Sequence, residues 1–334
     1  MLARLKGVSA GGMKAKVPVT VISGFLGSGK TTLLNHILTR PHGLKIAVLI
    51  NEFGELGIDG RLVVAADRDM VELNNGCICC TLNEGLIAAL RRIRKSEKPF
   101  DYLVIETTGI ADPRPVAMTF VRPEFQGEMR LDSILTVVDA ENFDPGRFED
   151  PAARNQIRFA DCLLLNKTDL VTEPRLREVE RQLQEINPQA KILRTLRCEV
   201  ALPLILGVGG SGLEVAESDE PAHACTPECQ HRNEEHSHGF QTFGHALSRA
   251  VHAERFQKFL EGLPAEVFRA KGFLRVEGAE TPYLFHLVGR RFTLEPMALQ
   301  AQEPARMVFI GTKLDRPGLR RGLEACQMAE VSGP

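Results

Sequence analysis

The sequence predicts an α/β fold with a mostly parallel sheet, followed by a smaller α+β domain. Three observations lead to this prediction. Short apolar runs alternate with helical patterns between residues 17 and 195, as parallel strands joined by helices do. An acidic, glycine-rich stretch interrupts the alternation at residues 207–239. Strand-like runs and two helical patterns then resume in a different order over residues 240–326.

The elements of the first domain follow one another with short connections. Continuous runs of β-branched residues and leucine predict strands that are buried on both faces of a sheet. The predicted strands are residues 17–23, 45–52, 102–107, 133–139, 162–169 and 191–195. The predicted helices are residues 31–39, 83–94 and 174–186.

The second domain has its own pattern. Its predicted strands are residues 268–278, 283–295 and 306–313, and its predicted helices are residues 252–263 and 316–327. The stretch at residues 207–239 carries many acidic residues and is predicted to be an exposed linker.

Composition excludes several classes of protein. The chain has 334 residues, 43% of them hydrophobic, so it can bury a core and is not a disordered chain. Its net charge of -2 provides no electrostatic footprint for nucleic acid or an anionic membrane, so neither is expected as a partner. The longest uncharged apolar run, residues 200–213, is shorter than the ~18 residues of a membrane span.

Residues 24–31 read GFLGSGKT and match the phosphate-binding pattern G-x-x-x-x-G-K-[ST]. The segment follows a predicted strand and begins a helix, so its backbone N–H groups can surround phosphate oxygens. Lys30 is expected to reach the β- and γ-phosphates, and the Thr31 hydroxyl to hold Mg²⁺. The predicted nucleotide-binding residues here are Gly24, Gly27, Ser28, Gly29, Lys30, Thr31 and Thr32.

Two strand ends supply the rest of a guanine nucleotide site. Glu106 ends a predicted strand beside the loop and is expected to bind Mg²⁺ through water, while Gly109 can bring its N–H to a γ-phosphate. Asn166 and Lys167 begin the segment NKTD, and Asp169 ends it. The Asp169 carboxylate can accept from two guanine N–H groups that adenine lacks, which predicts GTP as the nucleotide.

Three cysteines in four residues predict a metal site. Cys77, Cys79 and Cys80 lie in the segment GCICC, and three thiolates suit Zn²⁺ or a similar divalent ion. The fourth ligand stays open between water, glutamate and histidine. Glu52, in the segment NEFGE, is a candidate ligand for either metal. This clustering of cysteines indicates a reduced, cytoplasmic protein, and the separate Cys162, Cys198 and Cys326 are expected to be small buried residues.

The linker contains a second group of possible metal ligands. These are Cys225, Cys229, His231, His236 and His238. Their spacing is compatible with an auxiliary zinc site or with a disordered metal-collecting arm.

Together these segments resemble the CobW family of P-loop GTPases, and in particular its zinc-chaperone branch. The resemblance rests on VPVTVISGFLGSGKTTLLNHIL, NEFGE, VELNNGCICC, FDYLVIETTGIADP, NQIRFADCLLLNKTDL, FRAKGFL and VFIGTKLD, and it extends from Lys16 to about Cys326. Ser28 differs, since the family commonly has alanine there. The implied domains are an extension at 1–16, a P-loop GTPase domain at 17–206, a linker at 207–239, a CobW-type C-terminal domain at 240–327 and a tail at 328–334.

The resemblance implies a GTP-dependent metallochaperone, which couples GTP hydrolysis to transfer of a metal ion to a client metalloprotein. The C-terminal domain would then face the client. Two alternatives stay open at this point. A zinc-buffering protein with a regulatory nucleotide site would bind metal equally with GTP and GDP. A small-molecule kinase would use the same loop, but the segments NKTD and GCICC argue against it.

Overall fold

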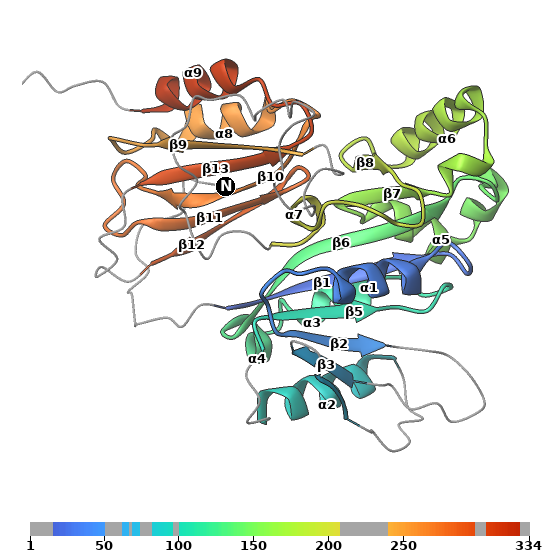
Figure 1. The fold of residues 1–334 in the computed structure, drawn as a ribbon. Coiled ribbons are helices and arrows are strands. Elements are labelled where there is room, and N and C mark those ends of the chain that lie inside the picture. The colour runs from blue at the N-terminus through green and yellow to red at the C-terminus, as the bar shows by residue number, and fades with distance from the viewer. Residues whose placement is uncertain are drawn as a thin grey trace, which may run out of the picture. The chain divides into compact units, whose positions relative to one another are not determined.

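A computed structural model of the chain describes residues 16–50, 62–66, 69–73, 82–95, 100–207, 240–297 and 305–327 (Figure 1). The chain divides into two compact units, whose described residues lie within 16–207 and within 240–327. In the described part of the chain, no helix has the length and hydropathy that a bilayer crossing requires.

The first unit is built on an eight-stranded sheet with the order β4-β3-β2-β5-β1-β6-β7-β8. Its strands are β1 (Val17–Gly24), β2 (Ile46–Ile50), β3 (Leu62–Ala66), β4 (Asp69–Leu73), β5 (Tyr102–Glu106), β6 (Met129–Asp139), β7 (Cys162–Asn166) and β8 (Lys191–Arg194). All pairs from β2 to β8 along the sheet are parallel. The predicted α/β fold with a mostly parallel sheet is therefore confirmed.

Helices connect and cover these strands. The elements are α1 (Lys30–Thr39), α2 (Leu82–Lys95), α3 (Arg114–Thr119), α4 (Pro123–Gln126), α5 (Pro151–Arg158), α6 (Glu173–Ile186) and α7 (Leu202–Ile205), with 3-10 turns η2 (Pro145–Glu149) and η3 (Thr168–Leu170). Apolar residues of α2 and α3 form one core with β1, β2 and β5. Those of α5 and α6 form another with β6 and β7. Burial of these apolar surfaces fixes the helices around the strand ends.

An antiparallel pair at one edge of the sheet was not part of the prediction. Strand β3 pairs antiparallel with β2, and β4 pairs antiparallel with β3. Leu73, the last residue of β4, is in register with Leu62, which pairs with Leu49, which pairs with Ile105. The chain therefore leaves β4 at the edge of the sheet where the parallel strands end.

Two strand boundaries differ from the prediction for local reasons. Strand β6 begins at Met129, four residues before the predicted start, where it pairs with Val17 of β1. The charged residues Arg130 and Asp132 hid this stretch in the sequence, and in the structure they form an ion pair of 3.0 Å. Strand β7 ends at Asn166, because Lys167 has a left-handed backbone with φ 61°. The predicted continuation to residue 169 is instead a 3-10 turn.

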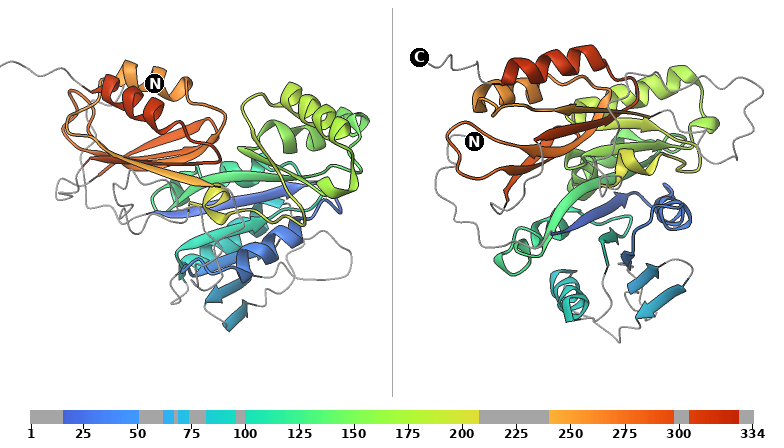
Figure 2. Two further views of the ribbon diagram at one scale, coloured as in Figure 1. Left: turned by 45° about the horizontal axis from the view of Figure 1, so that its top comes forward. Right: turned by 60° about the vertical axis from the view of Figure 1, so that its left-hand side comes forward.

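The second unit is a five-stranded antiparallel sheet with two helices. Its elements are β9 (Gln241–Ala246), α8 (Ala253–Glu261), β10 (Val267–Leu274), β11 (Tyr283–Val288), β12 (Arg291–Pro296), β13 (Arg306–Gly311) and α9 (Arg316–Cys326), with strand order β12-β11-β10-β13-β9. Both helices lie on one face of this sheet (Figure 2), where Phe256 and Leu323 pack with Phe285 and Phe309. The predicted α+β character is confirmed.

The strand predicted over residues 283–295 is a hairpin. Strands β11 and β12 pair antiparallel with Val288 opposite Arg291, and Gly289 takes φ 58° at the turn. Strand β9 was not predicted, because QTFGHA lacks a run of β-branched residues.

Candidate nucleotide-binding site

At two positions of the loop between β1 and α1, the backbone conformation and the space available permit only glycine. Gly24 has φ 136°, and a Cβ there would lie 2.3 Å from the Val137 carbonyl oxygen. Gly29 has φ 116°, and a Cβ there would lie 2.7 Å from Asn166 Nδ2. The loop can therefore lie close to both β6 and β7, with the start of α1 pointing its N–H groups into the loop.

Lys30 is buried at the start of α1. Its ammonium group donates to the Phe25 carbonyl oxygen at 3.1 Å, across the loop. Burial lowers the pKa of Lys30, and the nearby Glu106 carboxylate opposes that shift. The charge is therefore held close to the loop, where it can meet a phosphate.

Thr31 at the start of α1 and Glu106 at the end of β5 are brought together. The Thr31 hydroxyl donates to Glu106 Oε1 at 3.0 Å. Glu106 ends β5, which pairs directly with β1, so its carboxylate lies beside the loop. A hydroxyl and a carboxylate are hard oxygen donors, and this donor set fits Mg²⁺.

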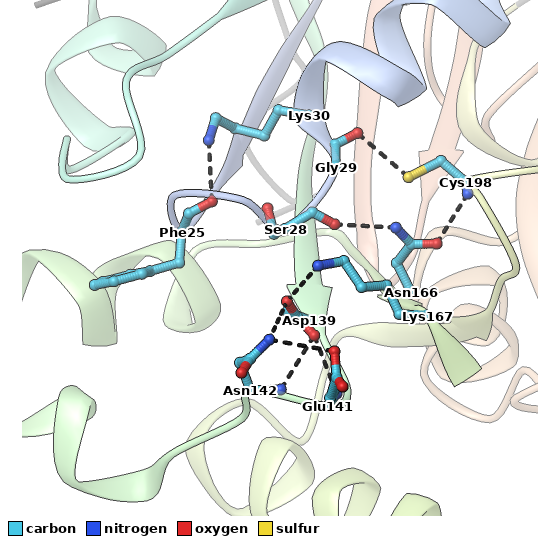
Figure 3. Close-up of polar contacts among 10 residues, drawn as sticks. All are labelled: Phe25, Ser28, Gly29, Lys30, Asp139, Glu141, Asn142, Asn166, Lys167 and Cys198. Atoms are coloured by element: carbon cyan, nitrogen blue, oxygen red, sulfur yellow. Dashed lines mark hydrogen bonds and ion pairs between the residues drawn. The ribbon is translucent and has the colours of Figure 1, made fainter. Parts of the chain in front are cut away.

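Asn166 connects the phosphate loop to the end of β8 (Figure 3). Its Nδ2 donates to the Ser28 carbonyl oxygen at 3.0 Å. Its Oδ1 accepts from the Cys198 N–H at 2.8 Å and from the Thr195 hydroxyl at 3.2 Å. The predicted role of Asn166, to tie this loop to its neighbours, corresponds to these three contacts.

Lys167 extends from the same strand end toward β6. Its ammonium group forms an ion pair of 2.7 Å with Asp139 Oδ2 (Figure 3). Asp139 also accepts from the Asn142 side chain and from the backbone of Glu141 and Asn142. Burial would raise the pKa of Asp139, but the hydrogen bonds from Lys167 and Asn142 outweigh it and hold the pKa below its ordinary value.

Asp139 has no role in the sequence prediction, which stopped at naming it as a strand end. Its position at the tip of the strand beside β1 was the available signal, since polar residues at such tips gather around a bound ligand.

The remaining predicted residues of the NKTD segment and the loop are more accessible. Asp169 lies in the 3-10 turn after Lys167 and is exposed, as is Thr32 on the first turn of α1. Gly27 has φ 74° with open space where a Cβ would be, and Ser28 is buried.

Gly109 lies against the phosphate loop. A Cβ on Gly109 would be 2.6 Å from the Leu26 backbone nitrogen. The carbonyl groups of Gly109 and Ala111 accept hydrogen bonds from Gln156 on α5, each at 3.1 Å. Gln156 was not predicted as a site residue, because a single glutamine on an amphipathic helix is not part of any recognisable sequence motif.

A cavity of about 250 Å³ adjoins the loop. Phe25, Gly27, Asp139, Lys167 and Gln156 contribute to its wall, together with η2. On η2, the Arg147 guanidinium lies 5.1 Å from the centre of the Phe25 ring. The cavity thus joins the phosphate loop to the strand ends that carry the predicted base-binding segment.

The three separate cysteines are buried, as expected, and form no disulfide. Cys198 contacts the nucleotide site: its thiol donates to the Gly29 carbonyl oxygen at 3.3 Å. Burial raises the pKa of Cys198 to about 12, so its thiol stays protonated.

The predicted metal ligands lie outside the described residues. These are Glu52, Cys77, Cys79, Cys80, Cys225, Cys229, His231, His236 and His238. Within the described part of the chain, no group of three or more His, Cys, Asp or Glu residues could hold a metal ion.

A glycine-rich loop between a buried strand and a helix, with a strand-tip carboxylate bonded to the first helical threonine, defines a P-loop nucleotide-binding protein. Comparison with known families agrees. The nucleotide-binding domain described as CobW/HypB/UreG matches residues 18–194, and the cobalamin synthesis protein CobW C-terminal domain matches residues 240–327. The chain belongs to the CobW family of P-loop GTPases.

Three curated relatives are similar over most of the chain. A zinc-regulated GTPase metalloprotein activator 1 of Dictyostelium discoideum is 36% identical, over 84% of this chain and 67% of the relative. The zinc chaperone CobW of a Sinorhizobium species is 33% identical, over 83% of this chain and 87% of the relative. The zinc chaperone YjiA of Escherichia coli is 33% identical, over 91% of this chain and 96% of the relative.

Proposed function

We propose that this GTPase is a metallochaperone that binds zinc, or a similar divalent metal, through Cys77, Cys79 and Cys80. GTP hydrolysis would be coupled to transfer of the metal to a client metalloprotein. The names of the similar proteins support zinc as the cargo. The observation that carries the proposal is the register of the sheet, since the chain leaves β4 at Leu73 on the edge where β5 ends with Glu106.

The nucleotide side of the proposal follows from the contacts of the loop. Lys30 exchanges its bond to the Phe25 carbonyl for the β- and γ-phosphate oxygens. Asp169 accepts from guanine, Lys167 lies along the base, and Asn166 keeps the loop in place. Mg²⁺, held by the Thr31 hydroxyl and through water by Glu106, would neutralise charge on the phosphates.

The metal-binding part of the proposal is supported by the position of the edge strand β4. The chain leaves β4 at Leu73, level with Ile105 next to Glu106, and Cys77 comes four residues later. Helix α2 begins at Leu82, and its Leu86 and Leu90 pack in one core with Val116 of α3. Since α3 follows Gly109, a shift at the γ-phosphate end of the site can reach the cysteine segment through these two helices.

The other parts of the chain have assigned roles in this proposal. Residues 17–206 form the GTPase domain, residues 207–239 form a linker, and residues 240–327 face the client. Cys225, Cys229, His231, His236 and His238 of the linker supply auxiliary metal binding. Residues 1–16 and 328–334 are an extension and a tail.

The test is a competition titration of Zn²⁺ in the presence of GDP and of a non-hydrolysable GTP analogue. We expect the analogue to tighten Zn²⁺ binding by about 5- to 150-fold, and Zn²⁺ to tighten analogue binding by the same factor. Replacing the three cysteines by serine should abolish this coupling and leave GDP affinity nearly unchanged. Replacing His231, His236 and His238 should lower the total bound metal without changing the coupling.

One Zn²⁺ affinity in both nucleotide states of the wild type would contradict the chaperone function. The protein would then be better described as a zinc buffer with a regulatory nucleotide site.

A further inference from the structure

The side chain of Gln156 is buried beneath the loop that follows Glu106. It lies on α5 and is only 2% exposed. Its Nε2 donates to the carbonyl oxygens of Gly109 and Ala111, both at 3.1 Å. Both donor hydrogens of the amide are therefore used on one short segment of backbone.

The backbone of Gln156 is itself fixed to the sheet. Its carbonyl oxygen accepts from the Thr136 hydroxyl at 2.6 Å, and Thr136 lies in β6 in register with Ser23 of β1. The amide is thus anchored to the strand that leads into the phosphate loop, and not only to its own helix.

The opposite side of Gly109 meets the phosphate loop. A Cβ on Gly109 would lie 2.6 Å from the Leu26 nitrogen and 2.7 Å from Leu26 Cγ, so no other residue fits this backbone. Gly109 is held between Leu26 on one side and the Gln156 amide on the other. Its N–H position relative to the phosphate loop depends on both contacts.

The side chains of this loop alternate in exposure, since Ala111 is buried and its neighbour Ile110 is not. Ile110, between the two bonded carbonyl groups, is 59% exposed. The neighbouring Asn155 continues the attachment, because its Nδ2 donates to Asp112 Oδ2 at 2.9 Å. Two consecutive amides of α5 therefore hold residues 109–112.

We propose that Gln156 is a positioning residue for residues 109–112, the segment whose Gly109 N–H would meet the γ-phosphate. It holds Gly109 against the phosphate loop and so sets the discrimination between GTP and GDP. This inference rests on the proposed use of Gly109 in GTP hydrolysis. The hydrogen bonds of the Gln156 side chain go to Gly109 and Ala111, not to Lys30, Asn166 or Asp169, so we expect GDP binding to depend on Gln156 much less than binding of a GTP analogue does.

The first variant is Gln156→Met, which keeps the side-chain length and removes both donors. We expect its affinity for a non-hydrolysable GTP analogue to fall by about 10- to 100-fold, the effect of losing two neutral hydrogen bonds to one loop. GDP affinity should stay within about 3-fold of the wild type. The single-turnover rate of GTP hydrolysis should fall together with analogue affinity.

The second variant, Gln156→Glu, adds a second measurement, the pH dependence of the preference for the GTP analogue over GDP. A purely structural role of Gln156 would not change this dependence. Only the protonated carboxyl group can donate to a carbonyl, and burial raises the pKa of such a group. The lost preference for the GTP analogue over GDP should therefore recover partly as the pH falls from about 8 to about 5.5. The Gln156→Met variant should show no recovery. If Gln156→Met does not fold, the pH profile of Gln156→Glu is compared with that of the wild type instead, whose preference should not change in this way.

Asn187→Ala is the matched control. Asn187 is also a buried amide that donates to several carbonyl groups near α5, those of Ile157, Arg158 and Ala160, but it does not touch residues 109–112. It should lower the stability of the unit and leave the ratio of analogue to GDP affinity unchanged.

Three results would overturn the proposal: equal loss of analogue and GDP affinity in Gln156→Met, an increased preference for the analogue, or the same change of ratio in Asn187→Ala. Failure of the underlying function is a separate result, since it would appear as a wild-type protein that does not distinguish GTP from GDP or does not hydrolyse GTP.

Discussion

Replacing Asn166 by alanine should weaken both the fold of the first unit and its affinity for nucleotide. The side chain makes three hydrogen bonds, to the Ser28 carbonyl oxygen, the Cys198 N–H and the Thr195 hydroxyl. Each neutral hydrogen bond contributes about 0.5–1.5 kcal/mol, so their loss should lower the free energy of unfolding by roughly 1.5–4.5 kcal/mol. Because Ser28 belongs to the phosphate loop, GDP affinity should also fall by about 2- to 13-fold, the value of one such bond.

The matched control is Thr195→Val. It removes one of the three bonds and leaves the contact between Asn166 and Ser28 intact. We expect it to cost about 0.5–1.5 kcal/mol in the free energy of unfolding, with GDP affinity unchanged. Far-UV circular dichroism during urea denaturation measures the first quantity, because the chain has no tryptophan and two tyrosines for fluorescence. Titration with a fluorescent GDP analogue measures the second.

The reasoning would be refuted by an Asn166→Ala variant that unfolds at the same free energy as Thr195→Val and binds GDP like the wild type. The bond to Ser28 would then contribute nothing to the shape of the loop.

Three other expectations concern the nucleotide site. Asp169→Asn should cost roughly 1.5–3 kcal/mol of GTP binding and shift preference toward xanthosine nucleotides, and equal turnover of ATP and GTP by the wild type would contradict guanine selection. Intrinsic GTP hydrolysis should be far below about 1 s⁻¹, because Ile110 stands where a water-orienting glutamine would be expected; a phosphate-release assay on zinc-free protein in the presence of Mg²⁺ measures it. The stability that Asp139 provides should be present above pH ~4 and be lost as the pH falls through its lowered pKa. Asp139→Asn should remove this part of the acid unfolding curve.

The positions of the phosphate loop and of Glu106 in the fold were predictable because the signals for them are local in sequence. Residues 24–31 carry their own strand and helix context, and Glu106 ends a run of buried residues that reads as a strand. Such segments fix both the backbone shape and the residues that face the ligand. Asn166 could be assigned to tying the loop in place for the same reason.

The parts that were missed depend on contacts between distant segments. Strands β3 and β4 were missed because antiparallel pairing at a sheet edge adds no periodic signal of its own. Gln156 was missed because its function is set by the carbonyl groups it faces, which are 45 and 47 residues away in sequence. The hairpin at Gly289 was missed because a two-residue turn barely interrupts an apolar run.

The strand order also determines how a signal can cross the first unit. Strand β4 is three strand spacings from β5 and four from β1, roughly 14 and 19 Å at ~4.8 Å per strand. Exposed charges separated by more than ~8 Å are largely screened at physiological ionic strength. The coupling proposed between the nucleotide loop and the chain leaving β4 would therefore have to pass through the hydrogen-bonded strands and the helices packed on them. Such mechanical coupling should be nearly independent of salt concentration, whereas direct attraction between the two sites would weaken steadily as salt is added.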